Sequence, residues 1–136
     1  MGLRTHAALA AFLMVDASAQ ITLQDPAGGS RTAGPAVLYG TWGTAEQCAA
    51  HRAGIRDDFT RFPYVISDQW IQHGLIYCRI SWQSHHDDDT VTQARAMVQC
   101  GEDSVRDYRV SFRLQQGLLQ MRWSEHFTTR PLERCP

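Results

Sequence analysis

The sequence predicts a mainly β domain: a single small antiparallel β-barrel or sandwich of about seven strands, with one short helix and two disulfides. Apolar and polar residues alternate over residues 76–82, 108–114 and 119–123, with the two-residue period of strands that have one buried face. The four cysteines are widely spaced and contain no Cys-x-x-Cys pair, which favours two disulfides. The length of 136 residues leaves room for one domain.

The N-terminal segment, residues 1–19, has the three-part pattern of a secretory signal peptide. A basic start at Arg4 precedes an apolar run over residues 7–15 and a small-residue end, so cleavage is expected after Ala19. The run is shorter than the ~20 residues that span a bilayer. Its apolar residues are continuous and do not follow the one-sided spacing of an amphipathic helix, which disfavours an amphipathic cytosolic N-terminus. We therefore expect a periplasmic or secreted protein.

The first folded elements follow a Pro- and Gly-rich segment. Residues 20–36 are expected to form a flexible leader, and residues 37–136 the disulfide-stabilised β domain. Residues 37–42 predict a strand. Thr44 and Gln47 then form a capping box for a short helix over residues 45–53 that ends at Gly54.

The remaining elements are strands joined by polar turns. The predicted strands are residues 62–66, with a proline near the start, then 70–72, 75–83 and 91–100, followed by a hairpin over 108–114 and 119–123. Turns are expected at residues 67–68, 73–74 and 101–103, a polar tip at 84–89, and a C-terminal tail at 127–136.

The four cysteines link different parts of this scheme. Cys48 lies on the predicted helix and Cys135 in the tail, while Cys78 and Cys100 lie on the same inward face of adjacent strands. Three pairings are possible. The pairing that we prefer is Cys48–Cys78 with Cys100–Cys135, because it would fasten both peripheral elements to the sheet. Two disulfides indicate an oxidising compartment.

The charge composition gives no preference for nucleic acid or anionic lipid, since the net charge is −1. All 13 basic residues are arginine, and the chain has neither Lys nor Asn. Both missing residues have AT-rich codons, so the composition is typical of a GC-rich, bacterial genome. An arginine surface for carboxylates or phosphates would require clustering, and along the chain the arginines are spread out.

Two resemblances concern the tryptophan of the first strand. Gly40-Thr41-Trp42 resembles the Gly-x-Trp signature of the calycins, the lipocalin and avidin group. The resemblance implies a barrel that carries a small apolar ligand and an arginine, Arg130 or Arg134, packed on Trp42 by a cation–π contact. The same motif followed by four spaced cysteines is similar to small exported bacterial proteins of unknown function. That similarity implies a disulfide-framed fold and no particular activity.

The polar tip contains the metal-ligating side chains His85, His86 and Asp87. They are adjacent, and the chain has none of the spaced zinc motifs such as His-Glu-x-x-His. Neither Gly-x-Ser-x-Gly nor Ser-x-x-Lys is present, and the cysteines are committed to disulfides, so no nucleophile stands out. We therefore predict no catalytic residue, metal or cofactor, and metal binding by residues 85–89 is kept as an alternative.

Large aromatic side chains provide the remaining candidates. Trp42, Trp82 and Trp123 fit the buried face of their strands. The pattern does not fix the orientation of four others, which are candidate binding residues: Trp70, Tyr64, Tyr39 and Tyr77.

These observations favour an exported, non-enzymatic binding protein directed at another protein, such as a hydrolase of the cell envelope. The alternative is a calycin-type carrier of a small apolar ligand. An apolar cavity would favour the carrier, whereas a barrel filled by Trp82, Phe112 and Met121 would favour the interaction protein.

Overall fold

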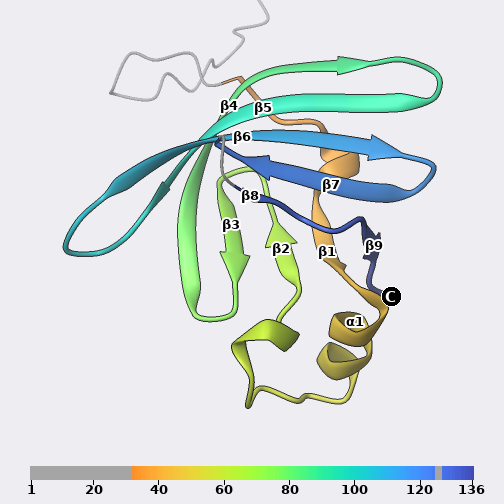
Figure 1. The fold of residues 1–136 in the computed structure, drawn as a ribbon. Coiled ribbons are helices and arrows are strands. Elements are labelled where there is room, and N and C mark those ends of the chain that lie inside the picture. Colours follow the sequence, from red (N-terminus) through yellow and green to blue (C-terminus); the bar gives the residue numbers. More distant parts are fainter. Residues whose placement is uncertain (1–31, 125–126) are drawn as a thin grey trace, which may run out of the picture.

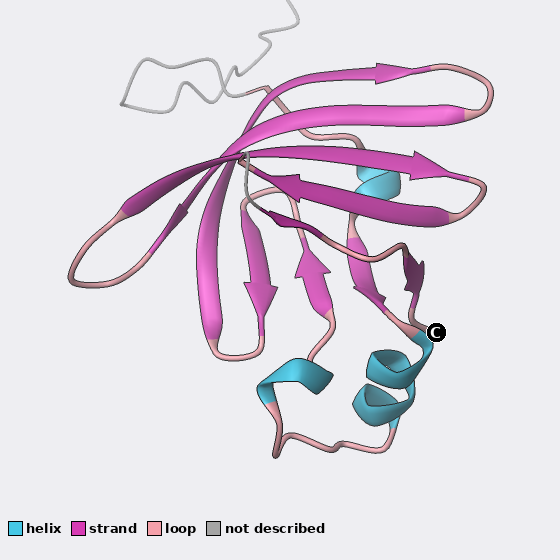
Figure 2. Ribbon diagram, viewed as in Figure 1, coloured by secondary structure: helices cyan, strands magenta, loops and turns pink. Residues whose placement is uncertain are grey.

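A computed structural model describes residues 32–124 and 127–136 of the protein, and it shows an antiparallel sheet wrapped into a barrel (Figures 1 and 2). In chain order, the elements are the 3-10 helix η1 (Ala36–Leu38), β1 (Gly40–Gly43), α1 (Ala45–Arg52), the 3-10 helix η2 (Phe59–Arg61), β2 (Tyr64–Ile66), β3 (Trp70–His73), β4 (Ile76–Asp87), β5 (Val91–Cys100), β6 (Arg106–Gln115), β7 (Leu118–Trp123), β8 (Phe127–Thr128) and β9 (Leu132–Arg134).

The barrel closes through its C-terminal strand. Strands β1 to β7 pair in sequential order, and β9 pairs with both β1 and β7. Eight strands therefore form a closed ring, while β8 pairs only with β7. The predicted fold class is confirmed, and of its two forms the barrel is correct. The segment predicted as a tail supplies the closing strand β9, which the sequence did not indicate because only Leu132 of its three residues is buried.

The barrel interior is filled by the side chains that the alternation predicts. Trp82, Phe112 and Met121 are buried, and Trp82 and Phe112 pack with ring centroids 5.0 Å apart. The other buried side chains of this core include Leu38, Trp42, Ile66, Ile71, Ile80, Val98, Val110, Leu119 and Leu132. Side chains of the described strands therefore fill the middle of the barrel.

Trp42 is held by two contacts. Its indole Nε1 donates to the Leu38 carbonyl at 2.8 Å, and the Arg134 guanidinium lies over its ring, 4.4 Å from the centroid. Arg134 also donates to the carbonyl oxygens of Val37 and Tyr39, at 2.6 and 2.7 Å. Of the two arginines expected on Trp42, Arg134 is therefore the partner.

Helix α1 agrees closely with its prediction. Thr44 Oγ1 accepts from the Gln47 N–H at 3.2 Å, and Gln47 Oε1 accepts from the Thr44 N–H at 2.9 Å, so the capping box is complete. Cys48 is buried on the inner side of the helix.

The preferred disulfide pairing was wrong. The bonds are Cys48–Cys135 and Cys78–Cys100. Cys78 and Cys100 are directly opposite each other in the β4–β5 register, with Cα atoms 4.4 Å apart, so they can bond without any movement of the backbone. The tail passes beside β1, where the Cys135 N–H donates to the Thr41 carbonyl, and this places Cys135 next to α1.

Two strand boundaries differ from the prediction. Residues 37–42 are not one strand, because η1 precedes β1, and β1 begins at Gly40 with a φ of +134°. Strand β4 continues through Asp87, so the predicted tip at residues 84–89 is mostly strand. The turn itself is centred on Asp88, whose Oδ1 accepts from the N–H groups of Thr90 and Val91 at 2.8 and 2.7 Å.

The expected signal peptide and most of the expected leader lie outside the described residues. The last part of that leader contacts the barrel: Thr32 forms a β-bridge with Trp82, and Pro35 is buried. Among the described residues, none of the helices has the length and apolar character needed to cross a membrane.

Candidate functional site

An apolar pocket of about 570 Å³ opens at one end of the barrel. Its walls come from the strand ends that meet there: β2, β4 and β6 begin at this end, and β3, β5 and β7 finish at it. The lining residues are Tyr64, Ile71, His73, Ile76, Cys78, Cys100, Asp107, Tyr108, Trp123, Ser124 and Phe127. We call this the barrel-end pocket.

Two titratable side chains of the pocket wall are kept uncharged by their surroundings. His73 stacks on Tyr64 with ring centroids 4.3 Å apart, and the edge of Phe59 lies 4.6 Å from the same imidazole. Burial lowers the pKa of His73, an effect that a hydrogen bond to the Phe62 backbone partly offsets, so the ring is neutral at pH 7. Burial also raises the pKa of Tyr64, which keeps its hydroxyl protonated.

The indole of Trp123 is the polar group of this pocket that lacks a partner. Its Nε1 is fully buried, and within the described part of the chain nothing accepts its hydrogen. Two other tryptophans satisfy this group: Trp42 Nε1 donates to the Leu38 carbonyl, and Trp82 Nε1 donates to the Asp68 carbonyl at 3.0 Å. A buried donor without an acceptor costs about 1–3 kcal/mol.

A second hollow lies on the outer surface of β2, β3 and β4. It has a volume of about 440 Å³ and is lined by Val65, Ser67, Trp70, Gln72 and Tyr77. Trp70 is 44% and Tyr77 59% exposed. The Arg79 guanidinium lies 5.7 Å from the centroid of the Trp70 ring. We call Val65, Trp70, Tyr77 and Arg79 the aromatic patch.

The four aromatic residues that the sequence proposed for binding are therefore in three places. Trp70 and Tyr77 share the aromatic patch, and Tyr64 lines the barrel-end pocket. Tyr39 lines neither site, and its hydroxyl makes contacts within the fold instead. Its hydroxyl lies 2.8 Å from the Gly34 carbonyl and 2.9 Å from an Asp68 carboxylate oxygen. Burial and the hydrogen bond to Asp68 raise the pKa of Tyr39 to about 12.

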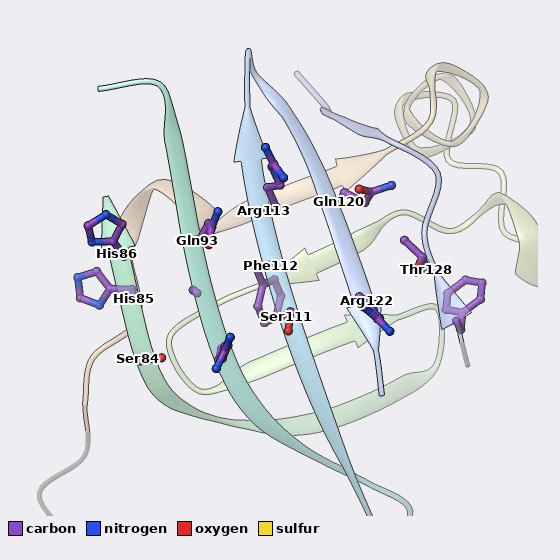
Figure 3. Close-up of a pocket in the computed structure, with 13 residues that line it drawn as sticks. Ser84, His85, His86, Gln93, Ser111, Phe112, Arg113, Gln120, Arg122 and Thr128 are labelled. Carbon is purple, nitrogen blue, oxygen red and sulfur yellow. The ribbon is translucent and has the colours of Figure 1, made fainter. Parts of the chain in front are cut away.

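A third hollow, of about 690 Å³, lies on the outer face of β4 to β8 (Figure 3). Its lining includes His85 and His86 at the β4 edge, together with Arg95, Arg113 and Arg122. The candidate metal ligands His85, His86 and Asp87 thus belong to a strand and not to a loop. No group of three or more His, Cys, Asp or Glu side chains suited to a metal ion occurs within residues 32–124 and 127–136.

Sequence reasoning missed two features of these sites. Trp123 was expected only to fill the core, because alternation shows which face a residue is on but not where along the barrel that face is hollow. The three arginines come from different strands, so their proximity depends on strand register, which the spacing of arginines along the chain does not show.

Comparison of the chain with protein-family models, curated proteins and solved structures finds no match. The function is therefore argued from the geometry of these sites.

Proposed function

We propose that the protein is an exported, non-enzymatic binding protein that holds a small, largely apolar ligand in its barrel-end pocket. The observation that carries the proposal is the apolar barrel-end pocket, which is lined by Trp123, a residue whose buried Nε1–H has no acceptor in the described structure. Such a donor selects a ligand with an oxygen acceptor on an otherwise apolar body.

The size and chemistry of the pocket support this function. Its volume of about 570 Å³ is within the range of small-molecule sites. His73 and Tyr64 are neutral, and Asp107 is the single carboxylate among the described lining residues. The Cys78–Cys100 disulfide forms part of the wall, so the site is largely preformed. Phe112 and Met121 fill the barrel interior, which favours the interaction protein. The apolar hollow at the end of the barrel favours the carrier.

Export is part of this proposal. The two disulfides suit an oxidising compartment, as does the signal-peptide pattern of residues 1–19. A periplasmic or secreted carrier would meet its ligand outside the cytosol.

Binding of the fluorescent ketone prodan, an apolar naphthalene with one carbonyl acceptor, tests the function. We expect saturable binding with a blue-shifted emission. The Trp123→Phe variant keeps an aromatic ring but has no N–H, so it should bind prodan about 2- to 12-fold more weakly, the equivalent of one neutral hydrogen bond.

Two further variants define the location. Trp70→Phe makes the same chemical change on the outer surface and should leave prodan binding unchanged. Ile76→Arg places a charge at the rim of the pocket, where Ile76 is half-exposed, and should abolish binding without unfolding the barrel. Absence of saturable prodan binding, or equal affinity of Trp123→Phe and the native protein, would contradict the proposal.

The aromatic patch favours a second function, recognition of a protein partner in the cell envelope. Exposed Trp, Tyr and Arg side chains around a hollow are the residues that dominate protein interfaces. A periplasmic pull-down, combined with inhibition assays on a panel of lysozymes and proteases, tests it. The interaction should be lost in Trp70→Ala and kept in Trp123→Phe. A pull-down that is empty, together with a negative inhibition panel, would count against this second function.

A further inference from the structure

The outer face of β4 to β8 carries a regular polar array. Strand register aligns its side chains in two rows that cross the strands (Figure 3). The first row is Ser84, Arg95, Ser111, Arg122 and Thr128, and the second is His86, Gln93, Arg113 and Gln120. We call these nine residues the arginine face.

These side chains point away from the barrel interior. On β5, Arg95 is exposed between the buried Ala94 and Ala96, and on β6, Arg113 is exposed next to the buried Phe112. Phe112 and Ala94 line the hollow of about 690 Å³ beneath the arginine face. Because the side chains of Phe112 and Ala94 are buried on the inner face, the accessible side chains of this shallow hollow are mainly polar.

Each arginine of this face has neutral neighbours across the strands. Arg95 lies between Ser84 and Ser111 in the register, and Arg122 lies between Ser111 and Thr128. In the second row, Arg113 is flanked by Gln93 and Gln120, and its guanidinium donates to Gln115 Oε1 at 3.0 Å. The described residues that line the hollow include three arginines and two histidines but neither Asp nor Glu.

The spacing of the three arginine Cα positions suits a chain of anionic groups better than a single ion. Arg95 and Arg122 are two strands apart in one row, a distance of about 9.5 Å between their Cα positions. Arg113 is a diagonal neighbour of both, at about 7–8 Å. The first row crosses five strands. The second row ends on β4 at His86, and the acidic turn at Asp88 lies beyond that end. A bound anionic chain would therefore run along the first row.

We propose that the arginine face binds an acidic polysaccharide, with carboxylate or sulfate groups on the arginines and sugar hydroxyls on the serine, threonine and glutamine side chains. Arginine forms forked, charge-assisted hydrogen bonds with such anions. Single-stranded nucleic acid is less favoured, because it uses large aromatic stacking platforms along the groove and Phe127 is the one exposed Phe, Tyr or Trp among the described lining residues.

Calorimetric titration of the native protein with polygalacturonate, heparin and uncharged dextran tests the proposal. We expect saturable binding to at least one of the two anionic polymers, weakening as salt is added, and none to dextran. Polygalacturonate binding would identify carboxylate as the recognised group, and heparin binding would identify sulfate.

Single variants assign the binding to this face. Arg95→Gln, Arg113→Gln and Arg122→Gln should each weaken binding by about ten-fold, the effect of one charge-assisted hydrogen bond. Arg52→Gln removes the same charge from the exposed end of α1 and should have no effect. Ser111→Glu places a carboxylate between Arg95 and Arg122 and should abolish binding, whereas the neutral Ser111→Gln should retain it. Thermal melting of each variant confirms that it is folded.

Several results would overturn the proposal. Binding to neither anionic polymer at low ionic strength would do so, as would equal binding of dextran. An equal loss of affinity in Arg52→Gln would show that the attraction is non-specific. Tighter binding of single-stranded DNA or of phosphatidylglycerol vesicles than of both polymers would assign the face to a different class of anion.

Discussion

The two disulfides should contribute unequally to stability, and the inequality follows from the loops that they close. Cys48–Cys135 joins residues 87 apart in the sequence, whereas Cys78–Cys100 joins residues 22 apart and lies within the larger loop. In the chain-entropy model, a loop of 22 residues is worth about 3.4 kcal/mol at 25 °C and a loop of 87 residues about 4.6 kcal/mol. Because the inner bond shortens the outer loop, the outer bond adds about 4.3 kcal/mol when both are present.

Urea unfolding of two double variants measures this difference. Cys48→Ala/Cys135→Ala should lose about 1 kcal/mol more than Cys78→Ala/Cys100→Ala. With a denaturant slope of about 1.5 kcal/mol/M, its midpoint should be lower by about 0.7 M. Non-reducing peptide mapping of the native protein checks the pairing itself. A lower midpoint for the Cys78/Cys100 variant would refute the loop-entropy argument, and a Cys48–Cys78 peptide would refute the connectivity.

Three further predictions concern individual side chains. Arg134→Met should lower the free energy of unfolding by about 2 kcal/mol, since it loses the cation–π contact with Trp42 and two carbonyl hydrogen bonds; Arg134→Lys, which cannot fork, should be intermediate in urea unfolding. Burial lowers the pKa of His73 in the folded state, so the unfolded chain binds this proton first as the pH falls below about 6.5. Thermal melting across pH should therefore show that stability decreases below this pH, and that it decreases less in His73→Phe. Burial and the hydrogen bond to Asp68 raise the pKa of Tyr39 to about 12, so stability should fall between about pH 10 and 12. In an ultraviolet titration, Asp68→Asn should shift the late ionisation of Tyr39 to lower pH.

The local parts of the fold could be predicted because their signals lie within a few residues. The capping box needs only Thr44 and Gln47, and the inward parity of β6 and β7 is visible in residues 108–114 and 119–123. Strand β4 beyond Trp82 has no comparable local signal. A bulge between Trp82 and Ser84 shifts the register there, and from Gln83 onward every residue of the strand is exposed, so alternation in hydrophobicity stops while the pairing with β5 continues.

Contacts between distant segments were the harder part to predict. The disulfide pairing depended on whether Cys78 and Cys100 were in register, which parity alone does not decide. The barrel-end pocket required knowledge of where the strands end, because Trp123 looks the same in the sequence whether its indole is packed or borders a hollow.

The two proposed sites depend on the same strands and on their register. Strands β5 and β6 present Cys100 and Tyr108 to the barrel-end pocket and alternate residues, such as Arg95 and Arg113, to the outer surface. A one-residue slip would exchange the two faces, moving arginines inward and apolar side chains outward. The Cys78–Cys100 bond joins directly opposed residues and so fixes the β4–β5 register, while the bulge after Trp82 sets Ser84 opposite Arg95. This inner disulfide closes the shorter loop, yet it fixes the register on which both the apolar pocket and the arginine face depend.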